Sequence, residues 1–251
     1  MGAPKLRVFA GPNGSGKSTI KDQIPARLVN LYVNADELEK SAKTTGFIDL
    51  SDYGLELTEQ ALRTYLTQHP LIIRAGLQES AGRLTLVGQK IEFRGVDVNS
   101  YHAAVIADLI RHQLLERRIS FTFETVMSSS EKVRFMETAQ QMGYRTYLYF
   151  VATDSPQINI LRVANRVDDG GHDVPRDKIT QRYARTLSLL PEAISAANRA
   201  YIFDNSGDES VFYQTKDNPL FFLAKKQARG VNGGEVFTLL YVVTASCADR
   251  D

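Results

Sequence analysis

Residues 6–20, LRVFAGPNGSGKSTI, decide the fold, because a short apolar run leads directly into a glycine-rich turn and then a helical segment. Residues 6–10 are mostly apolar, as in a buried strand, and residues 11–18 match the pattern G-x-x-x-x-G-K-[ST]. Glycine lets successive backbone N–H groups turn inward without Cβ clashes, so such a turn can surround a phosphate at the start of the following helix. The stretch therefore predicts a loop that holds the phosphates of a nucleotide.

The polar groups of this turn have expected roles. The Lys17 ammonium reaches the β- and γ-phosphates, and the Ser18 hydroxyl ligates the Mg²⁺ that bridges them. We therefore expect ATP and Mg²⁺ as cofactors, with Ser18 as the metal ligand. The alternative is a glycine-rich turn that matches by chance, which the strand before it and the helix after it disfavour. The expected nucleotide-binding residues are Gly11, Pro12, Asn13, Gly14, Ser15, Gly16, Lys17, Ser18, Thr19 and Asp204.

The composition is that of an ordinary globular protein. The chain has 251 residues, of which 43% are apolar, enough to bury the core of one large α/β domain. With 30 basic and 29 acidic residues the net charge is +1, which excludes a strong overall attraction to nucleic acids or anionic membranes. The single cysteine, Cys247, is typical of a reducing compartment. We find no signal-peptide pattern and no apolar run of about 20 residues, so we expect a cytoplasmic protein without membrane or nucleic-acid partners.

Short apolar runs alternate along the chain with longer segments of helical periodicity, which indicates parallel strands joined by helices. We expect an α/β fold with a five-stranded, mostly parallel sheet and helices on both faces. The expected strands are residues 6–10, 31–34, 119–123, 146–152 and 200–203. The expected helices are residues 17–28, 36–43, 56–68, 100–117, 130–141, 155–167 and 175–198.

We expect one kinase domain over residues 1–205, with two additions. Residues 82–97 carry two β-rich runs around Gly88-Gln89, which is typical of a small β-hairpin inserted at the edge of the sheet. Residues 206–251 alternate aromatic and polar side chains and predict a β-rich C-terminal extension packed on the same domain. No chemistry is predicted from this extension.

Two carboxylates follow expected strands. Ligands of an open parallel sheet bind at the carboxyl ends of its strands, so Asp36 and Glu124 are expected at the same edge as the phosphate loop. Asp36 can accept the proton of an alcohol that attacks phosphorus. Glu124, followed by Thr125, can orient that alcohol by hydrogen bonding. The alternatives are that Asp36 only caps a helix and that Glu124 is a solvated strand end.

Residues 161–190 combine several arginines with the Gly170-Gly171 turn, which predicts a lid of two helices. Arginines on a closing segment stabilise the charge that spreads over a transferred phosphoryl group. His172, within the turn, is expected to donate a hydrogen bond to a phosphate. The alternative is a pair of solvated helices with surface arginines.

Residues 201–207, YIFDNSG, end the last expected strand in a polar turn. Such a loop lies near the base when the phosphates occupy the first loop, and Asp204 is expected to contact adenine. An ordinary turn explains the same residues equally well.

Taken together, these residues resemble the zeta toxin family of P-loop kinases. The resemblance covers about residues 6–205 and leaves residues 69–97 and everything past residue 206 without a counterpart. It rests on GPNGSGKST, on Asn34-Ala35-Asp36 at the end of a strand, on FTFET with Glu124, on Asn165-Arg166-Val167, and on GGHDVP, ITQRYARTL and YIFDNSG.

The resemblance implies a kinase that uses ATP and Mg²⁺ to phosphorylate a hydroxyl of a small molecule. The best-known members act on the 3′-hydroxyl of the amino sugar in UDP-N-acetylglucosamine and are inhibited by an antitoxin protein. The resemblance implies catalytic roles for Lys17, Asp36 and Arg166. Where the toxins have a second lid arginine this sequence has His172, unless Arg182 of the next helix takes that place.

Two other functions stay open at this point. One is a kinase for another acceptor, such as an antibiotic, a nucleotide or a nucleic-acid end. The other is a non-catalytic binding module whose lid responds to ATP.

Overall fold

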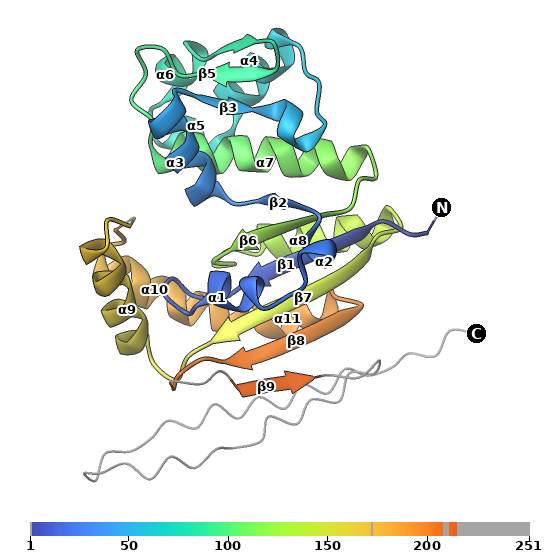
Figure 1. Ribbon diagram of the computed structural model, residues 1–251, viewed down its shortest axis with the longest axis vertical. Helices are drawn as coiled ribbons and strands as arrows, with labels where there is room; N and C mark the ends of the chain where they lie inside the picture. The colour runs from blue at the N-terminus through green and yellow to red at the C-terminus, as the bar shows by residue number, and fades with distance from the viewer. Residues whose placement is uncertain (1, 172, 208–210, 215–251) are drawn as a thin grey trace. The chain divides into compact units, whose positions relative to one another are not determined.

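The computed structural model describes residues 2–171, 173–207 and 211–214 (Figure 1). Contacts within the chain divide it into two compact units. Unit 1 comprises Met1–Ala26 and Thr125–Asp251, and unit 2 comprises Arg27–Glu124. The phosphate loop and the arginine-rich segment are therefore in unit 1, and both expected acceptor carboxylates are in unit 2.

Unit 1 contains four adjacent strands in the order β1, β7, β8, β9 (Figure 1). The first three are parallel, and β9 runs antiparallel to β8. Because β1, β7 and β8 run in the same direction, the loops that follow them leave the same edge of the sheet. The strands are β1 (Lys5–Ala10), β7 (Arg145–Ala152), β8 (Arg199–Asp204) and β9 (Val211–Gln214).

Three aromatic rings stack across this sheet and hold β1 in place. The ring of Tyr149 lies 4.7 Å from that of Phe9 and 4.9 Å from that of Tyr201, measured between centroids. Ile20 of the first helix is packed into the same cluster. The strand that leads into the phosphate loop is thus fixed by large apolar contacts to β7 and α1.

The helices of unit 1 begin and end close to their predicted limits, with two interruptions. The predicted helix 17–28 stops before Pro25, because proline disfavours helical geometry in the residue before it. The predicted helix 175–198 divides at Leu189, and Pro191 lies in the first turn of its second part. The helices are α1 (Lys17–Asp22), α2 (Ala26–Val29, across the boundary of the units), α8 (Glu131–Gln141), α9 (Pro156–Asp168), α10 (Arg176–Ser188) and α11 (Leu190–Ser195).

Unit 2 contains a parallel strand pair and a small antiparallel sheet. Strand β2 (Leu31–Val33) pairs with β6 (Phe121–Thr125), with Val33 opposite Phe123. The predicted hairpin around Gly88-Gln89 is present, formed by β4 (Thr85–Val87) and β5 (Lys90–Glu92). An unpredicted strand, β3 (Phe47–Asp49), pairs with β5 and completes a three-stranded sheet.

The long helix α7 (Ser100–Glu116) is the core element of unit 2. Most of its residues are buried, and they include many apolar side chains and two charged ones, Asp108 and Arg111. Ion-pairing groups inside a core need partners, and these two have them, as described below. The other helices of the unit are α3 (Ala35–Thr45), the 3₁₀ helix Leu50–Tyr53, α4 (Glu59–Gln68), α5 (Pro70–Arg74) and α6 (Gln78–Gly82).

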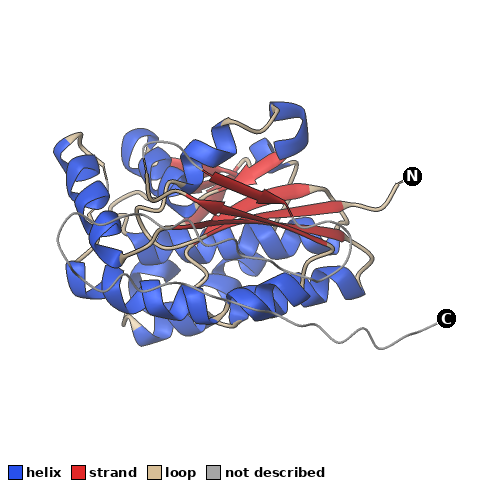
Figure 2. Ribbon diagram, turned by 90° about the horizontal axis from the view of Figure 1, so that it is seen from below, coloured by secondary structure: helices blue, strands red, loops and turns tan. Residues whose placement is uncertain are grey.

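The predicted α/β fold class is confirmed, since all five predicted strands are present as β1, β2, β6, β7 and β8. Figure 2 distinguishes the helices, in blue, from the strands, in red. Strand β6 begins and ends two residues later than predicted, so that Glu124 lies within it. Of the predicted C-terminal extension, residues 208–210 and 215–251 lie outside the described residues. In the described part of the chain, every helix is too short or too polar to span a membrane.

Candidate active site

The phosphate loop joins β1 to α1 and has a backbone that only glycine adopts easily. Gly11, Gly14 and Gly16 have φ values of +148°, +72° and +91°. A Cβ atom at Gly11 would lie 2.2 Å from the carbonyl oxygen of Val151, and one at Gly16 would lie 2.2 Å from Nδ2 of Asn205. The loop therefore packs tightly against its neighbours because it has no side chains at these positions.

Lys17, the first residue of α1, is buried, and its ammonium lies against the loop. Its Nζ donates hydrogen bonds to the carbonyl oxygens of Gly11 and Pro12, both at 3.0 Å. In the described part of the chain, the buried Asn13 Oδ1 and Ser15 Oγ have no hydrogen-bond partner. A buried cation beside a buried, unpaired hydroxyl donor is the chemistry that a phosphate oxygen requires.

Two asparagine side chains from other segments of unit 1 donate hydrogen bonds to the loop. Neither role was predicted from the sequence. Asn159 of α9 donates through Nδ2 to the carbonyl oxygen of Asn13 at 2.6 Å. Asn205, after β8, donates through Nδ2 to the carbonyl oxygen of Ser15 at 2.8 Å. These bonds fix the direction of two loop carbonyls, and with them the peptide planes that carry the loop's N–H groups.

The remaining nucleotide-side candidates lie at the surface of unit 1. Ser18 and Thr19 are exposed in the first turn of α1. The carboxylate of Asp204 accepts hydrogen bonds from the backbone N–H of Ser206 at 3.0 Å and from its hydroxyl at 2.5 Å. The residues YIFDNSG therefore do form a turn, and a contact from Asp204 to adenine stays a prediction.

Asp36 is exposed in the first turn of α3, and it does not cap that helix. The cap is Asn34, whose Oδ1 accepts from the backbone N–H of Asp36 at 2.8 Å and of Glu37 at 3.4 Å. The capping alternative for Asp36 is therefore wrong. Among the described residues, the Asp36 carboxylate has no hydrogen-bond partner, so the amide of Asn34 leaves it available for chemistry.

Glu124 is half-buried in β6 and is held by a directed series of hydrogen bonds within unit 2. Because Asn34 Oδ1 is the helix cap, its Nδ2 faces Tyr32 and donates to the phenol oxygen at 3.0 Å. Tyr32 in turn donates to Glu124 Oε2 at 2.7 Å, and Asn34 Nδ2 also approaches this oxygen at 3.4 Å. The alternative that Glu124 is a solvated strand end is therefore wrong.

The same series keeps Tyr32 protonated. Burial, together with the negative charge of Glu124, raises the pKa of Tyr32 far above its usual value. The phenol therefore remains a hydrogen-bond donor throughout the neutral pH range. Glu124 and the start of α3, which carries Asp36, are thus connected through two side chains, Tyr32 and Asn34.

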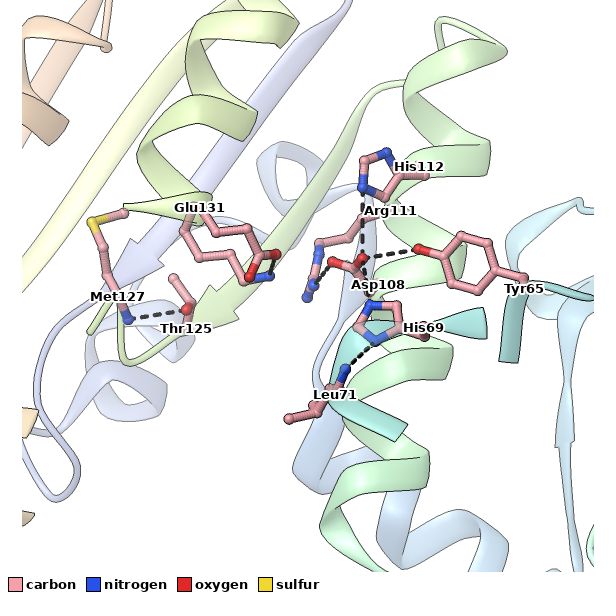
Figure 3. Close-up of polar contacts among 10 residues, drawn as sticks. Tyr65, His69, Leu71, Asp108, Arg111, His112, Thr125, Met127 and Glu131 are labelled. Carbon is pink, nitrogen blue, oxygen red and sulfur yellow. Dashed lines mark hydrogen bonds and ion pairs between the residues drawn. The ribbon is translucent and has the colours of Figure 1, made fainter. Parts of the chain in front are cut away.

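Thr125 follows Glu124 but belongs to unit 1. Its hydroxyl accepts a hydrogen bond from the backbone N–H of Met127 at 3.0 Å (Figure 3). Met127 has a φ of +55°, so this bond stabilises a tight turn after β6. An additional contact from Thr125 to an acceptor stays a prediction.

The predicted lid consists of α9 and α10 of unit 1, joined by the turn at residues 169–175. Arg166, in the last turn of α9, and Arg182, in α10, are both half-buried. The backbone N–H of Gly171 donates to the carbonyl oxygen of Arg166 at 2.8 Å, and a Cβ atom at Gly171 would lie 2.6 Å from Arg166 Cγ. The turn therefore packs on the stem of Arg166. His172 lies outside the described residues.

A polar cluster in unit 2 surrounds the buried Asp108 of α7 (Figure 3). Asp108 Oδ1 accepts from Arg111 Nη2 at 2.5 Å, and Oδ2 accepts from the Tyr65 hydroxyl at 2.9 Å. His69 Nε2 and His112 Nε2 lie 3.5 and 3.6 Å from Oδ2. No motif in the sequence indicates this cluster, because its members come from three separate helical segments.

The Asp108 cluster also supports the strand that carries Glu124. The guanidinium of Arg111 lies over the ring of Phe123, 5.1 Å from its centroid. Phe123 is fully buried and immediately precedes Glu124 in β6. The cluster therefore fixes β6 against α7 within unit 2 through a cation–π contact.

Comparison with known proteins shows similarity to kinases and kinase-like toxins. Residues 95–218 match the model of the family described as Zeta toxin. A stretch of 106 residues, 39% of this chain, is 31% identical to a shikimate kinase of Streptomyces coelicolor and covers 61% of that protein. A stretch of 72 residues, 29% of this chain, is 29% identical to an uncharacterized protein of Haemophilus influenzae and covers 51% of it. The matches thus span between about half and two thirds of these relatives.

One solved structure agrees at the level of fold. A crystal structure of AvrRxo1-ORF1:AvrRxo1-ORF2 with sulphate ions aligns with a TM-score of 0.52 at 13% identity, over 83% of this chain and 57% of that chain. A structure from the PezAT chromosomal toxin-antitoxin system of Streptococcus pneumoniae aligns with a TM-score of 0.44 at 16% identity, over 87% and 74% of the two chains. With the family match, the resemblance to zeta toxin P-loop kinases is confirmed.

Proposed function

We propose that this protein is a kinase that transfers the γ-phosphate of ATP to a hydroxyl group of a small molecule. The observation that carries the proposal is the phosphate loop, in which Gly11, Gly14 and Gly16 let the backbone pack tightly against its neighbours and Lys17 supplies a buried cation. The zeta toxin match and the relative named shikimate kinase support phosphoryl transfer as the use of this loop.

On the nucleotide side, the loop from Gly11 to Thr19 binds the triphosphate through its backbone N–H groups and Lys17. Ser18 is the residue that would hold Mg²⁺, because Mg²⁺ takes oxygen ligands and obtains most of them from phosphates and water. When bound, Mg²⁺ neutralises charge on the β- and γ-phosphate oxygens. Asp204 and its turn contact the adenine.

On the acceptor side, Asp36 is the general base. It takes the proton of the acceptor hydroxyl while the oxygen attacks the γ-phosphorus, and ADP leaves with the electron pair of the broken P–O bond. The absence of a hydrogen bond to its carboxylate among the described residues supports this role. Glu124, oriented by Tyr32, holds the acceptor together with Thr125.

The lid stabilises the reacting phosphoryl group and excludes water that would otherwise hydrolyse ATP. Arg166 is the first charged donor of the lid. Arg182 or His172 takes the place of the second arginine that the zeta toxins have there.

For the acceptor we propose a UDP-amino sugar, as the resemblance to the zeta toxins implies, and an antitoxin protein as the inhibiting partner. A second acceptor class is a small hydroxylated acid, which the name of the shikimate kinase relative favours. Both place a hydroxyl beside Asp36 and differ in what Glu124 would contact.

Incubation with γ-labelled ATP, Mg²⁺ and a bacterial metabolite extract tests the proposal, with labelled products identified by mass spectrometry. We expect a labelled nucleotide sugar from the wild type and none from Lys17→Met. Glu124→Gln should reduce the label, whereas Asp52→Asn, which removes an exposed carboxylate elsewhere in unit 2, should not.

The outcomes separate the alternatives. A labelled hydroxy acid, antibiotic or nucleic-acid end would replace the nucleotide sugar as acceptor and keep the kinase. Tight ATP binding without any labelled product would contradict the kinase and favour an ATP-responsive binding module.

A further inference from the structure

A line of buried polar groups in unit 1 has no part in the proposed chemistry. Asn159 of α9 is completely buried and Thr153, at the end of β7, is almost completely buried. The Thr153 hydroxyl donates a hydrogen bond to Asn159 Oδ1. Buried polar side chains are costly unless each of their groups is paired, so this pair has a definite geometry.

One end of this line is the phosphate loop. Asn159 donates a hydrogen bond through Nδ2 to the carbonyl oxygen of Asn13 at 2.6 Å. The helix backbone is equally close, because a Cβ atom at Gly14 would lie 2.6 Å from the carbonyl oxygen of Asn159 and 3.1 Å from Cγ2 of Val163. The loop and the first turns of α9 therefore cannot shift independently.

A second set of hydrogen bonds connects the same helix to the loop. Arg162 of α9 donates through Nη1 to the carbonyl oxygen of Asn205 at 2.7 Å. Asn205 holds the carbonyl oxygen of Ser15, as described above. Two of the loop carbonyls, at Asn13 and Ser15, are thus positioned by α9, one directly and one through Asn205.

The other end of the line is the second lid helix. Tyr183 of α10 is buried and donates through its hydroxyl to the carbonyl oxygen of Thr153 at 2.6 Å. Val163 and Ile179 pack α9 and α10 together in one apolar cluster. A hydrogen-bonded path therefore runs from Asn13 through Asn159 and Thr153 to Tyr183.

The path shares a helix face with the first lid arginine. Asn159, Val163 and Arg166 are spaced by four and three residues along α9, and such residues lie on one side of a helix. The side of α9 that touches the phosphate loop is therefore also the side that carries Arg166.

We propose that Asn159 is a positioning residue that couples the phosphate loop to the lid. It fixes the loop carbonyl at Asn13 and, through Thr153, is tied to Tyr183 of α10. A change in the loop, such as the arrival of phosphates, is thereby transmitted to both arginine-bearing helices. One part of this inference rests on the proposed function, namely that the lid uses the coupling during phosphoryl transfer. The coupling itself does not depend on that function.

Amide hydrogen exchange on the full chain, without nucleotide, tests the coupling. Exchange is read in peptides that cover residues 11–20 and residues 176–188, in the wild type and in the variants Asn159→Ala, Tyr183→Phe and Gln157→Ala. Tyr183→Phe keeps the buried ring and removes only the hydroxyl. Gln157 is exposed on the same helix and serves as the matched control.

We expect Asn159→Ala and Tyr183→Phe each to raise exchange about five-fold in both peptides, as the loss of one buried hydrogen bond allows. Gln157→Ala should change neither peptide. The decisive result is the loop peptide of Tyr183→Phe, because the Tyr183 hydroxyl donates to Thr153, which is itself two hydrogen bonds away from the loop along this path.

Exchange that rises only near each substitution, with the loop unaffected by Tyr183→Phe, would overturn the proposal. If Asn159→Ala does not fold, Asn159→Asp keeps the shape and the acceptor for Thr153 but loses the donor for Asn13, and it should show the same pattern. Since no ATP is present, a negative result here differs from a failure of the proposed kinase, which the labelling of metabolites measures.

Discussion

The phosphate loop of unit 1 and the proposed acceptor carboxylates of unit 2 are built in contrasting ways. The loop depends on backbone geometry, with glycines at positions where a Cβ atom would meet a neighbouring atom at 2.2 Å. The acceptor side depends on side chains, since Tyr32 and Asn34 orient Glu124 from an ordinary strand and helix start. Substitutions in the loop of unit 1 should therefore lower ATP affinity, whereas substitutions of the proposed acceptor side in unit 2 should lower transfer and leave ATP affinity unchanged.

Gly11→Ala should have the largest effect. The new Cβ would lie 2.2 Å from the carbonyl oxygen of Val151, at a φ of +148°. Because that carbonyl belongs to the sheet and cannot move aside, we expect ATP affinity to fall about 1,000-fold. Titration calorimetry with Mg-ATP measures the loss.

Gly54→Ala is the matched control in unit 2. Gly54 also has a positive φ, +63°, but no atom lies within 4 Å of its would-be Cβ. We expect a loss of stability of about 1 kcal/mol and unchanged ATP affinity. Equal ATP affinity in both alanine variants would remove the distinction between the two regions.

Asp108→Asn should cause the next largest effect, on stability. It leaves the guanidinium of Arg111, which is 5% exposed, without its charged partner. The expected loss is about 3 kcal/mol in the free energy of unfolding, measured by urea denaturation. Glu59→Gln, which breaks the exposed pair with Arg63, should cost less than about 0.5 kcal/mol. Similar losses in both variants would show that the buried cluster is not a structural anchor of unit 2.

Tyr32→Phe should reduce phosphorylation of the acceptor about ten-fold, because Glu124 loses one buried donor. ATP affinity should stay unchanged, since Tyr32 belongs to the acceptor side. Tyr101→Phe, on an exposed ring of α7, is the control and should alter neither quantity. A fall in ATP affinity with unchanged transfer would reverse the assignment of the two regions.

The smallest effect concerns the pH dependence of stability, and it involves His102 of unit 2. Burial lowers the pKa of His102, which is 2% exposed and contacts Ser80 Oγ at 3.0 Å. The unfolded chain therefore binds a proton below about pH 6.5 that the folded protein resists. This contribution to stability is fully present above that pH and is lost as the pH falls toward the lowered pKa.

Urea denaturation at pH 7.5 and pH 5.5 measures this dependence. His102→Gln, which cannot titrate, should lose less stability between the two pH values than the wild type does. An unchanged pH dependence in this variant would assign the effect to other groups.

The same contrast explains what could be predicted from the sequence. The phosphate loop was predictable because Gly11, Gly14 and Gly16 lie close together in the chain and their spacing reflects backbone geometry. The strands were predictable because each is a short apolar run between polar segments. Helices α5 and α6 were missed because they have only 5 residues each, too few for a periodic pattern. Strand β3 was missed because it is defined by its pairing with β5, which is distant in sequence.

The side-chain networks could not be predicted, because they join residues that are distant in sequence. Tyr32 and Glu124 are 92 residues apart, and Asn159 and Asn13 are 146 apart. Either asparagine or aspartate could have capped α3, and only the structure shows that Asn34 does so. That result matters for function, because it leaves the Asp36 carboxylate unused by the helix.

The central claim is that Asp36 of unit 2 acts as base on a phosphoryl group bound by the loop of unit 1. The most direct test compares the wild type with Asp36→Asn in ATP affinity and in single-turnover transfer from γ-labelled ATP to the metabolite extract. We predict ATP affinity within about two-fold of the wild type and transfer reduced about 1,000-fold, in the range of a lost general base. Transfer by Asp36→Asn at the wild-type rate would contradict the account.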